Sequence, residues 1–216
     1  QAFNMTRACD LTGKKVQICG MTGSSSVLFK TASTLHSWSG IGIANGSNDY
    51  ISDQVLKNRY KRAKWQNVHI LIIDEVSMMS KKIFELLDCI AKKCRSDSRF
   101  FGGIQLILCG DFFQLPPVGN PNDLCSQQFC FESHLFRVNF PPESCVQLKQ
   151  NFRQCTDPVF TNILNEIRYG QLSQKSISVL MNCQNKSVPD SVIRIFSLKR
   201  DVISFNTKKL NELPGE

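Results

Sequence analysis

Aliphatic runs separated by polar segments divide the chain into predicted strands and helices. The run Ile70-Leu71-Ile72-Ile73 contains no polar position, which is typical of a strand buried on both faces of a parallel sheet. Other short apolar runs have a similar character. We therefore predict strands at residues 16–20, 69–73, 104–109, 145–148 and 192–196.

Helical spacing of apolar residues falls between several of these strands. The clearest case is residues 81–94, where apolar side chains recur every three or four positions and lysines occupy the other faces. Strands that alternate with helices predict an α/β fold around a largely parallel sheet. The apolar positions of the three predicted helices are Ile83, Leu87, Ile90 and Cys94; Phe160, Ile163, Leu164 and Ile167; and, more weakly, Val202, Phe205, Leu210 and Leu213.

The composition is that of a folded protein with a basic surplus. Apolar residues make up 42% and charged residues 20% of the 216 residues, which excludes a disordered chain. The 26 Lys and Arg exceed the 18 Asp and Glu, and the resulting charge of +8 favours a polyanionic partner such as nucleic acid. No apolar run is long enough to cross a bilayer, so we expect a soluble protein. The 10 cysteines include no C-x-x-C pair, which favours free thiols.

Two adjacent carboxylates, Asp74 and Glu75, follow the aliphatic run at residues 70–73. Ionised side chains are costly inside a sheet, so we expect both acids at the end of the strand. A nucleoside triphosphatase uses such a pair, because the first acid holds Mg²⁺ and the second orients or deprotonates the attacking water. The alternative is a buried strand that ends in acidic turn residues.

A second aliphatic strand ends in a polar loop, in the segment "IQLILCGDFFQLPPV". It delivers Gly110, Asp111 and Gln114 to the carboxyl edge of the predicted sheet, where α/β proteins bind ligands. The amide of Gln114 is suited to sensing a γ-phosphate. The alternative is a turn with incidental polar residues.

The joined set "LIIDEVSM", "FGGIQLILCGDFFQLPPV", "ASTLHSWSGIGIA", "LKQNFRQ" and "LNELPGE" closely resembles the petite-integration-frequency (PIF) DNA helicases. This family is related to RecD within helicase superfamily 1. The resemblance runs from about Val16 to the end of the sequence. It implies a RecA-like P-loop NTPase domain at residues 1–140, then a connecting region and the start of a second RecA-like domain at residues 141–216.

The resemblance also implies roles at a nucleotide site that binds ATP and Mg²⁺. Asp74 would be the Mg²⁺ ligand, Glu75 the catalytic base and Gln114 the sensor that links the γ-phosphate to DNA. Arg153 matches an arginine that reaches across the cleft between two RecA-like domains and stabilises charge on the phosphoryl group. For Arg153 the alternative is a surface arginine at a helix start.

A DNA-binding segment is implied by "ICGMTGSSS" and "TLHSWSGIG". Thr22, Gly23 and Ser24 would offer hydroxyl and backbone donors to DNA phosphates, although the segment departs from the more usual Thr-Ala-Ser-Thr-Gly pattern. His36 and Trp38 would contact sugar or stack on a base. For Trp38, packing in the core is an equal alternative.

No G-x-x-x-x-G-K-[ST] motif occurs in the 216 residues, because "TGKK" lacks the hydroxyl after Lys14. We expect this phosphate-binding loop just before Gln1, and motifs V and VI of the family beyond Glu216. These residues alone should then hydrolyse ATP poorly.

The function implied by the resemblance is that of an ATP-dependent DNA helicase that moves 5′ to 3′ on single-stranded DNA and unwinds duplexes in replication, recombination, repair or telomere maintenance. Single-stranded and forked DNA are the expected partners, and we expect a monomer without a membrane partner. The expected location is intracellular, in the nucleus or mitochondrion of a eukaryote and otherwise in the cytoplasm or a viral host. The alternatives are a RecD-type exonuclease subunit, a relaxase-helicase, or a catalytically silent nucleic-acid-binding fragment.

Overall fold

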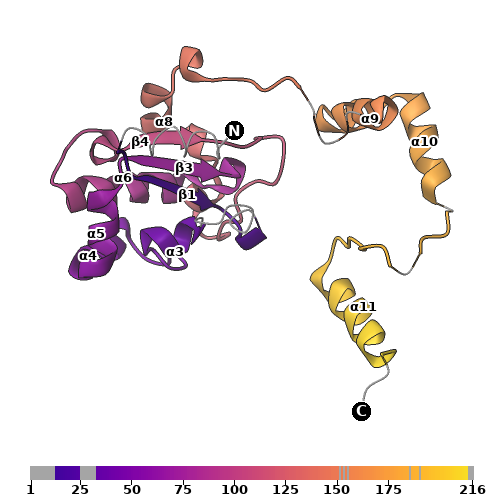
Figure 1. Ribbon diagram of the computed structural model, residues 1–216, viewed down its shortest axis with the longest axis horizontal. Helices are drawn as coiled ribbons and strands as arrows, with labels where there is room; N and C mark the ends of the chain where they lie inside the picture. The colour runs from indigo at the N-terminus through magenta and orange to yellow at the C-terminus, as the bar shows by residue number, and fades with distance from the viewer. Residues whose placement is uncertain are drawn as a thin grey trace. The chain divides into compact units, whose positions relative to one another are not determined.

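A parallel sheet forms the centre of the first part of the chain (Figure 1). The computed structural model describes residues 13–24, 33–150, 152, 154, 156–184, 186–189 and 191–213. Within these residues the strands are β1 (Val16–Gly20), β2 (Ser33–Thr34), β3 (Ile70–Asp74) and β4 (Gln105–Leu108), in the order β2-β1-β3-β4. All neighbouring pairs are parallel. The predicted α/β fold is confirmed, and so are the predicted strands at 16–20, 69–73 and 104–109, the last two with ends shifted by one residue.

Helices connect the strands and continue beyond them. The chain divides into two compact units, residues 1–149 and 150–216. The first unit contains α3 (Leu35–Ser39), α4 (Asn48–Lys57), α5 (Arg59–Asn67), α6 (Lys81–Arg95), α7 (Leu124–Gln127) and α8 (His134–Asn139). It also contains the short 3₁₀ helices η1 (Val76–Met78), η2 (Phe100–Gly103), η3 (Cys130–Glu132) and η4 (Pro142–Ser144). The second unit contains α9 (Pro158–Arg168), α10 (Gln174–Gln184) and α11 (Lys199–Asn211).

The alternation of side chains along β3 builds apolar clusters on both faces of the sheet. Leu71 and Ile73 belong to the larger cluster, which also includes buried side chains of α3, α4, α5 and α6. Ile70 and Ile72 point the other way and pack with Ile18 of β1. All four β3 side chains are at most 5% exposed, which explains why the run contains no polar residue.

The helix α6 forms where its apolar spacing predicts it. Its first turn is capped by Ser80, whose hydroxyl accepts a hydrogen bond from the Ile83 N–H. Phe84, Leu87 and Ile90 of its apolar stripe are fully buried, and Ile83 is half-buried. α6 therefore covers one face of the sheet as a single amphipathic element.

Arg95, in the last turn of α6, fixes the end of α5. Its Nη1 donates to the carbonyl oxygens of Trp65, Gln66 and Val68 at 3.0, 3.1 and 2.9 Å. Its Nε donates to the carbonyl of Gly102 at 2.6 Å. The last carbonyls of a helix have no partner within the helix. A single guanidinium thus satisfies the end of α5 and holds it beside α6 and η2.

Two predicted strands, residues 145–148 and 192–196, are wrong. Both segments are irregular in the structure. Val146 is 85% exposed and Ile195 is 95% exposed. An apolar run becomes a strand only when a neighbouring strand accepts its hydrogen bonds, and no strand among the described residues pairs with either segment.

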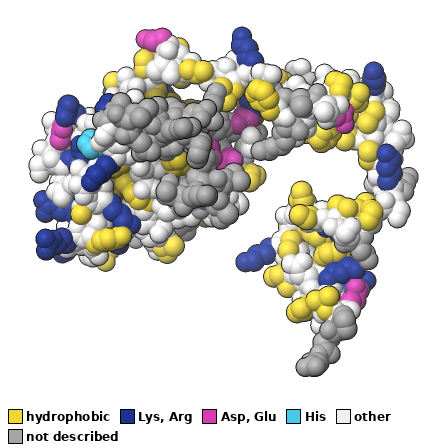
Figure 2. All heavy atoms as spheres, in the orientation of Figure 1, with side chains coloured by type: hydrophobic (Ala, Val, Ile, Leu, Met, Phe, Trp, Pro, Cys, Tyr) yellow, Lys and Arg dark blue, Asp and Glu magenta, His cyan; other side chains and the backbone are white. Residues whose placement is uncertain are grey.

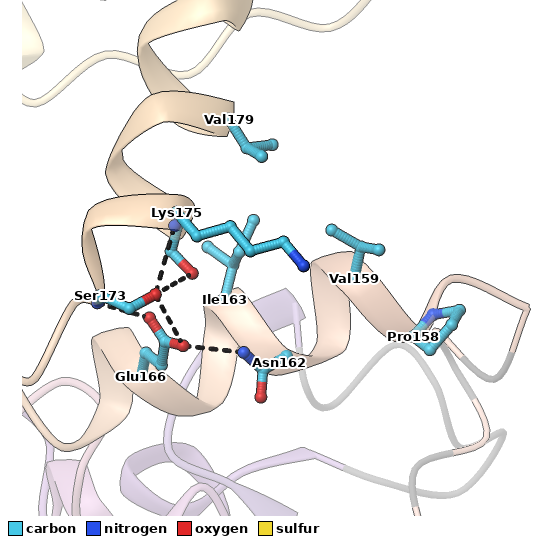
Figure 3. Close-up of a pocket in the computed structure, with 9 residues that line it drawn as sticks. Pro158, Val159, Asn162, Ile163, Glu166, Ser173, Lys175 and Val179 are labelled. Carbon is cyan, nitrogen blue, oxygen red and sulfur yellow. Dashed lines mark hydrogen bonds between the residues drawn. The ribbon is translucent and has the colours of Figure 1, made fainter.

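In the second unit, α9 and α10 form a helical pair joined through Glu166 (Figure 3). The Glu166 carboxylate accepts hydrogen bonds from the Ser173 N–H at 2.8 Å and from the Asn162 amide at 2.7 Å. A cavity of about 330 Å³ beside this network is lined by apolar side chains, including Val159 and Val179, and by polar ones. The hydrogen bonds from Ser173 and Ser176 lower the pKa of Glu166 below its ordinary value of 4.5. Glu166 is therefore a structural cap at the start of α10.

Replacing Arg95 with Met should lower the free energy of unfolding by about 2–3 kcal/mol, because carbonyl oxygens at the end of α5 lose a charged donor. Urea unfolding followed by circular dichroism measures this change. The control is Arg99→Met, since Arg99 is exposed, pairs with Asp97 two residues away and should matter much less. Equal effects of the two substitutions would contradict the role assigned to Arg95.

The stabilisation from Glu166 should depend on pH. Because its pKa is lower in the folded protein than in the unfolded chain, its contribution is complete above the unfolded value and is lost as pH falls through the folded value. Amide hydrogen exchange in α9 and α10 should therefore show a difference between the unchanged chain and Glu166→Gln that shrinks below pH 4.5. Glu143→Gln, at an exposed residue, is the control. A difference that stays constant with pH would show that the carboxylate charge is irrelevant.

Candidate functional site

The polar segments singled out in the sequence follow the ends of adjacent parallel strands. Gly20, the last residue of β1, pairs in register with Asp74, the last residue of β3. Ile73 pairs with Leu108, the last residue of β4. Since the strands are parallel, the loops that follow them emerge at the same edge of the sheet. This carboxyl edge therefore brings together Thr22–Ser24, Asp74–Glu75 and the loop that contains Gln114.

The turn after β3 holds both candidate acids at this edge. Asp74 and Glu75 are half-buried. The Asp74 Oδ1 accepts the Glu75 N–H at 3.0 Å, and the Asp74 carbonyl accepts the Met21 N–H at 3.2 Å. Glu75 has φ 59° and ψ 44°, a left-handed conformation that is unfavourable for a residue with a side chain. The bonds around it hold the chain in this turn and fix the direction of the Asp74 carboxylate.

Gly110 lets the loop after β4 lie directly against this turn. The Cys109 N–H donates to the Ile73 carbonyl at 2.8 Å, and the Cys109 carbonyl accepts the Val76 N–H at 3.0 Å. Gly110 has φ 154°, and a Cβ at this position would lie 2.8 Å from the Val76 nitrogen. Only glycine allows this approach without displacing the backbone. The two loops therefore act as one structural unit.

Asp111 shapes the loop that carries Gln114. Its Oδ1 accepts the Phe113 N–H at 3.1 Å, and its carbonyl accepts the Gln114 N–H at 2.9 Å. Its Oδ2 accepts from the Gln114 Nε2 at 3.3 Å. Gln114 is exposed, so its amide is held at the open side of the edge by one side-chain bond. Asp111 is named by the sequence motif, but its role as organiser of this turn follows only from the structure.

Cys109 reports the electrostatics of the edge. Burial raises the pKa of its thiol above 9.0, and the nearby negative charge of Asp74 raises it further. The thiol therefore stays protonated at neutral pH and is a poor nucleophile. Because the charge of Asp74 acts on the pKa of this thiol, the carboxylate after β3 and the residue after β4 lie close together.

The loop after β1 presents hydroxyl groups beside Asp74. The Thr22 Oγ1 and the Ser24 Oγ lie 3.0 Å apart and share a hydrogen bond. Gly23 and Ser24 are exposed. The structure thus places three of the five predicted DNA-contacting residues, Thr22, Gly23 and Ser24, at the carboxyl edge, next to the candidate nucleotide site.

His36 and Trp38 lie on α3 but differ in exposure. His36 is half-buried, and burial lowers its pKa below 6.5, which favours the neutral imidazole at neutral pH. Trp38 is 5% exposed, and its ring centroid lies 4.7 Å from that of Trp65. The Trp65 Nε1 donates to the Ser39 carbonyl at 3.1 Å. Trp38 therefore occupies the core position that the sequence left as an alternative, and its indole has little surface for stacking on a base.

The remaining features concern Arg153, metal ligands and membrane spans. Arg153 lies outside the described residues. Among the described residues, no group of three or more His, Cys, Asp or Glu side chains could hold a metal ion. A search of the same residues finds no helix with the length and apolar character of a membrane span.

Comparisons with known proteins agree on one family. The model of the PIF1-like helicases matches residues 4–177. The chain is 37% identical over 215 residues to the ATP-dependent DNA helicase RRM3 of Saccharomyces cerevisiae, covering 95% of this chain and 28% of RRM3. It is 35% identical over 186 residues to the ATP-dependent DNA helicase PIF1 of the same species, covering 85% of this chain and 21% of that protein. The chain thus spans about a quarter of the length of these curated relatives.

Solved structures give the same answer. The crystal structure of Pif1 helicase from Candida albicans matches with a TM-score of 0.82 and 30% identity, covering 98% of this chain and 47% of that one. Pif1 helicase from Bacteroides in complex with ADP-AlF3 and ssDNA matches with a TM-score of 0.75 and 28% identity, covering 94% of this chain and 48% of that one.

Replacing Trp38 with Ala should lower the free energy of unfolding by about 3–5 kcal/mol, because a large side chain leaves the core beside Trp65. Thermal unfolding measures the loss. His36→Ala, at a half-buried position on the same helix, is the control and should shift the midpoint much less. An unchanged midpoint for Trp38→Ala would contradict the packing described above.

Proposed function

The chain belongs to the PIF1-like helicase family, and we propose that it forms most of the first motor domain of an ATP-dependent DNA helicase that moves along single-stranded DNA. The observation that carries the proposal is the junction of the β3 and β4 loops through Gly110, which joins the acids to the Gln114 loop. A motor of this kind has to couple a nucleotide site to a DNA site. In this chain both predicted sites lie at one edge of a rigid sheet.

The nucleotide side of the proposal rests on Asp74 and Glu75. Mg²⁺ in phosphoryl-transfer sites is held by one or two carboxylates together with phosphate oxygens and water, so it does not need a cage of protein ligands. Asp74 fits this requirement, because its Oδ2 is not used in the turn bond to Glu75. Bound Mg²⁺ would neutralise charge on the β- and γ-phosphates of ATP. Glu75 would take the proton of the attacking water, and the left-handed turn would keep its carboxylate in position.

Gln114 and Arg153 complete the proposed catalytic set. The Gln114 amide is exposed, and its one side-chain bond within the described part of the chain is to Asp111, so it can exchange that bond for a γ-phosphate oxygen. A movement of this loop would displace Val76, because Cys109 is hydrogen-bonded to Val76 and Gly110 packs against it. Arg153, proposed on its motif alone, would stabilise charge that develops on the phosphoryl group.

The DNA side of the proposal uses Thr22, Gly23, Ser24 and His36. Hydroxyl and backbone N–H donors suit DNA phosphates and carry no sequence preference. Trp38 supports this surface from within the core, where it holds α3 against α5. The relatives' structures include Pif1 with ssDNA and Pif1 at forked dsDNA, and both kinds of DNA are proposed partners here.

The remaining proposals concern the wider protein. The first motor domain would comprise residues 1–140, and residues 141–216 would lead into a second RecA-like domain. The division of the structure after Lys149 supports a boundary in this region. We propose 5′ to 3′ movement, a monomeric protein, and an intracellular location in the nucleus or mitochondrion, as befits a DNA helicase related to yeast and vertebrate proteins.

Glu75→Gln should abolish ATP turnover while leaving nucleotide binding intact, because the amide fills the same space but cannot accept a proton. The expected loss in DNA-stimulated turnover is about 10²- to 10⁴-fold. The measurement requires a helicase that contains these residues together with a phosphate-binding loop, assayed for ATP affinity and for phosphate release.

The matched control for this experiment is Glu143→Gln, which makes the same chemical change at an exposed residue. It should leave turnover unchanged. Normal turnover by Glu75→Gln would remove Glu75 as the base, and weakened nucleotide binding without a loss of turnover would assign it a different role.

A further inference from the structure

Helix α5 and Lys57, the residue before its N-cap Asn58, form a basic surface outside the candidate site. Residues 57–67 contain no acidic side chain and five cationic ones, Lys57, Arg59, Lys61, Arg62 and Lys64. Figure 2 shows Lys and Arg side chains gathered over the region of α4 and α5. The Lys61 ammonium already has a partner within the protein, because its Nζ donates to the Gly40 carbonyl at 3.0 Å. The other four cationic residues are called the basic face below.

The charges of the basic face are not neutralised locally. Lys57, Arg59 and Arg62 are exposed, and Lys64 is half-buried. Nearby lysines behave differently: Lys93 pairs with Asp49 at 3.2 Å and Lys92 pairs with Asp88 at 2.7 Å. Within the described ranges, no residue of the basic face takes part in an ion pair. The positive charges of the exposed residues Lys57, Arg59 and Arg62 are therefore available to a ligand.

The helix under the basic face is held rigidly. Trp65 is fully buried, and Arg95 binds the carbonyls at the end of the helix. At the start, the Asn58 Oδ1 accepts the Lys61 N–H at 3.0 Å. The backbone that carries the cations is thus ordered before any ligand arrives, so binding does not have to order it.

The basic face adjoins the proposed DNA track without belonging to the catalytic edge. Two hydrogen bonds join α5 to the end of α3, from Lys61 to Gly40 and from Trp65 to Ser39. The helix α3 also carries His36. Beyond α5 the chain enters β3 at Ile70, the strand end opposite Asp74. A DNA molecule that leaves the track at α3 can therefore reach α5 while moving away from the acids.

The chemistry of the basic face suits a duplex better than a single strand. Single strands are held by aromatic side chains on which bases stack. The aromatic side chain exposed on α5 is Tyr60, and the Lys64 Nζ lies 4.8 Å from its ring centroid, so one ring face is already occupied. The nine residues of α5 span about 13 Å, a length over which a duplex carries about eight negative charges. Arg59 and Arg62, three positions apart, lie on one side of α5 and can face neighbouring phosphates of such a duplex, whereas Lys64 lies on the side of Tyr60.

We propose that the basic face binds phosphates of double-stranded DNA, namely the duplex arm of a forked substrate whose single strand occupies the adjacent track. This proposal rests on the proposed helicase function. The contacts are electrostatic and independent of sequence. Each phosphate neutralised by a cation adds about 0.9 to the slope of log affinity against log salt concentration.

The test compares two DNA molecules on a helicase that contains this chain and a phosphate-binding loop. One is an unpaired oligonucleotide, and the other is the same oligonucleotide with a duplex arm of about two helical turns. The variant Arg59→Gln/Arg62→Gln should reduce the salt slope for the forked DNA by about 1.8. Its loss of affinity between about 50 and 200 mM salt should then be roughly twelvefold smaller than that of the unchanged protein. Binding of the unpaired oligonucleotide should not change.

Two controls separate this contact from a general effect of charge. Arg137→Gln removes one cation from an exposed position on α8 and should leave both slopes unchanged, whereas Arg62→Gln alone should reduce the forked slope by about 0.9. The variant Arg59→Lys/Arg62→Lys keeps both charges and should bind like the unchanged protein. If the double glutamine variant does not fold, the comparison of Arg62→Gln with Arg137→Gln decides.

Three results would overturn the proposal. If the double glutamine variant also loses salt slope on the unpaired oligonucleotide, the basic face belongs to the single-strand track. If Arg137→Gln lowers the slope as much as Arg62→Gln, the effect comes from net charge alone. If neither slope changes, α5 is a solvated surface that does not contact DNA. ATP hydrolysis stimulated by single-stranded DNA is measured in parallel. If the unmodified protein lacks it, the helicase function fails; if it is normal while the slopes stay unchanged, only the duplex contact fails.

Discussion

The contact of Gly110 with the turn at Val76 is the constraint on which the candidate site depends. The acids and the Gln114 loop leave different strands, and parallel pairing alone would bring them only to the same edge. The absence of a side chain at Gly110 lets the two loops share the hydrogen bond from the Val76 N–H to the Cys109 carbonyl. A shift of either loop therefore has to move the other. In a motor, this is the coupling needed between sensing a phosphate and holding the attacking water.

The opposite side of the domain is built for rigidity. Arg95 binds carbonyls of α5 and η2, and Trp65 fills the space between α5 and α3 while donating to Ser39. Because these bonds link α3, α5 and α6, the surface that carries His36 is fixed to the same helices that cover the sheet. Loops that change their contacts during a reaction need such a fixed reference, since otherwise their movement would be absorbed by the domain.

The sequence predicts those parts of the structure that depend on local patterns. The run in β3 is apolar on both faces, and β1 and β4 are apolar except for Gln17 and Gln105, so their hydrophobic runs identify them. The motifs place the acids and Gln114 after the ends of these strands. The position of Trp38 could not be predicted, because it depends on Trp65, which lies far along the chain and was not singled out by any pattern. The strand predictions at 145–148 and 192–196 were wrong for a related reason. An apolar run does not show whether another strand will lie beside it and accept its hydrogen bonds. The left-handed turn at Glu75 likewise becomes visible only once Gly110 and Val76 are seen together.

The net charge of +8 gains meaning from its distribution. Asp74, Glu75 and Asp111 place three carboxylates after β3 and β4, so a phosphate reaches this part of the carboxyl edge favourably only with a cation. In the proposed function ATP would arrive there with Mg²⁺, whereas DNA phosphates would be held beside it by the hydroxyl groups of the loop after β1. Among the described residues, a group of cations without an ion pair lies on α5, beside α3 and away from the acidic end of β3. If the proposed function holds, electrostatics would direct nucleotide and duplex DNA to different surfaces of one domain before any specific contact is made.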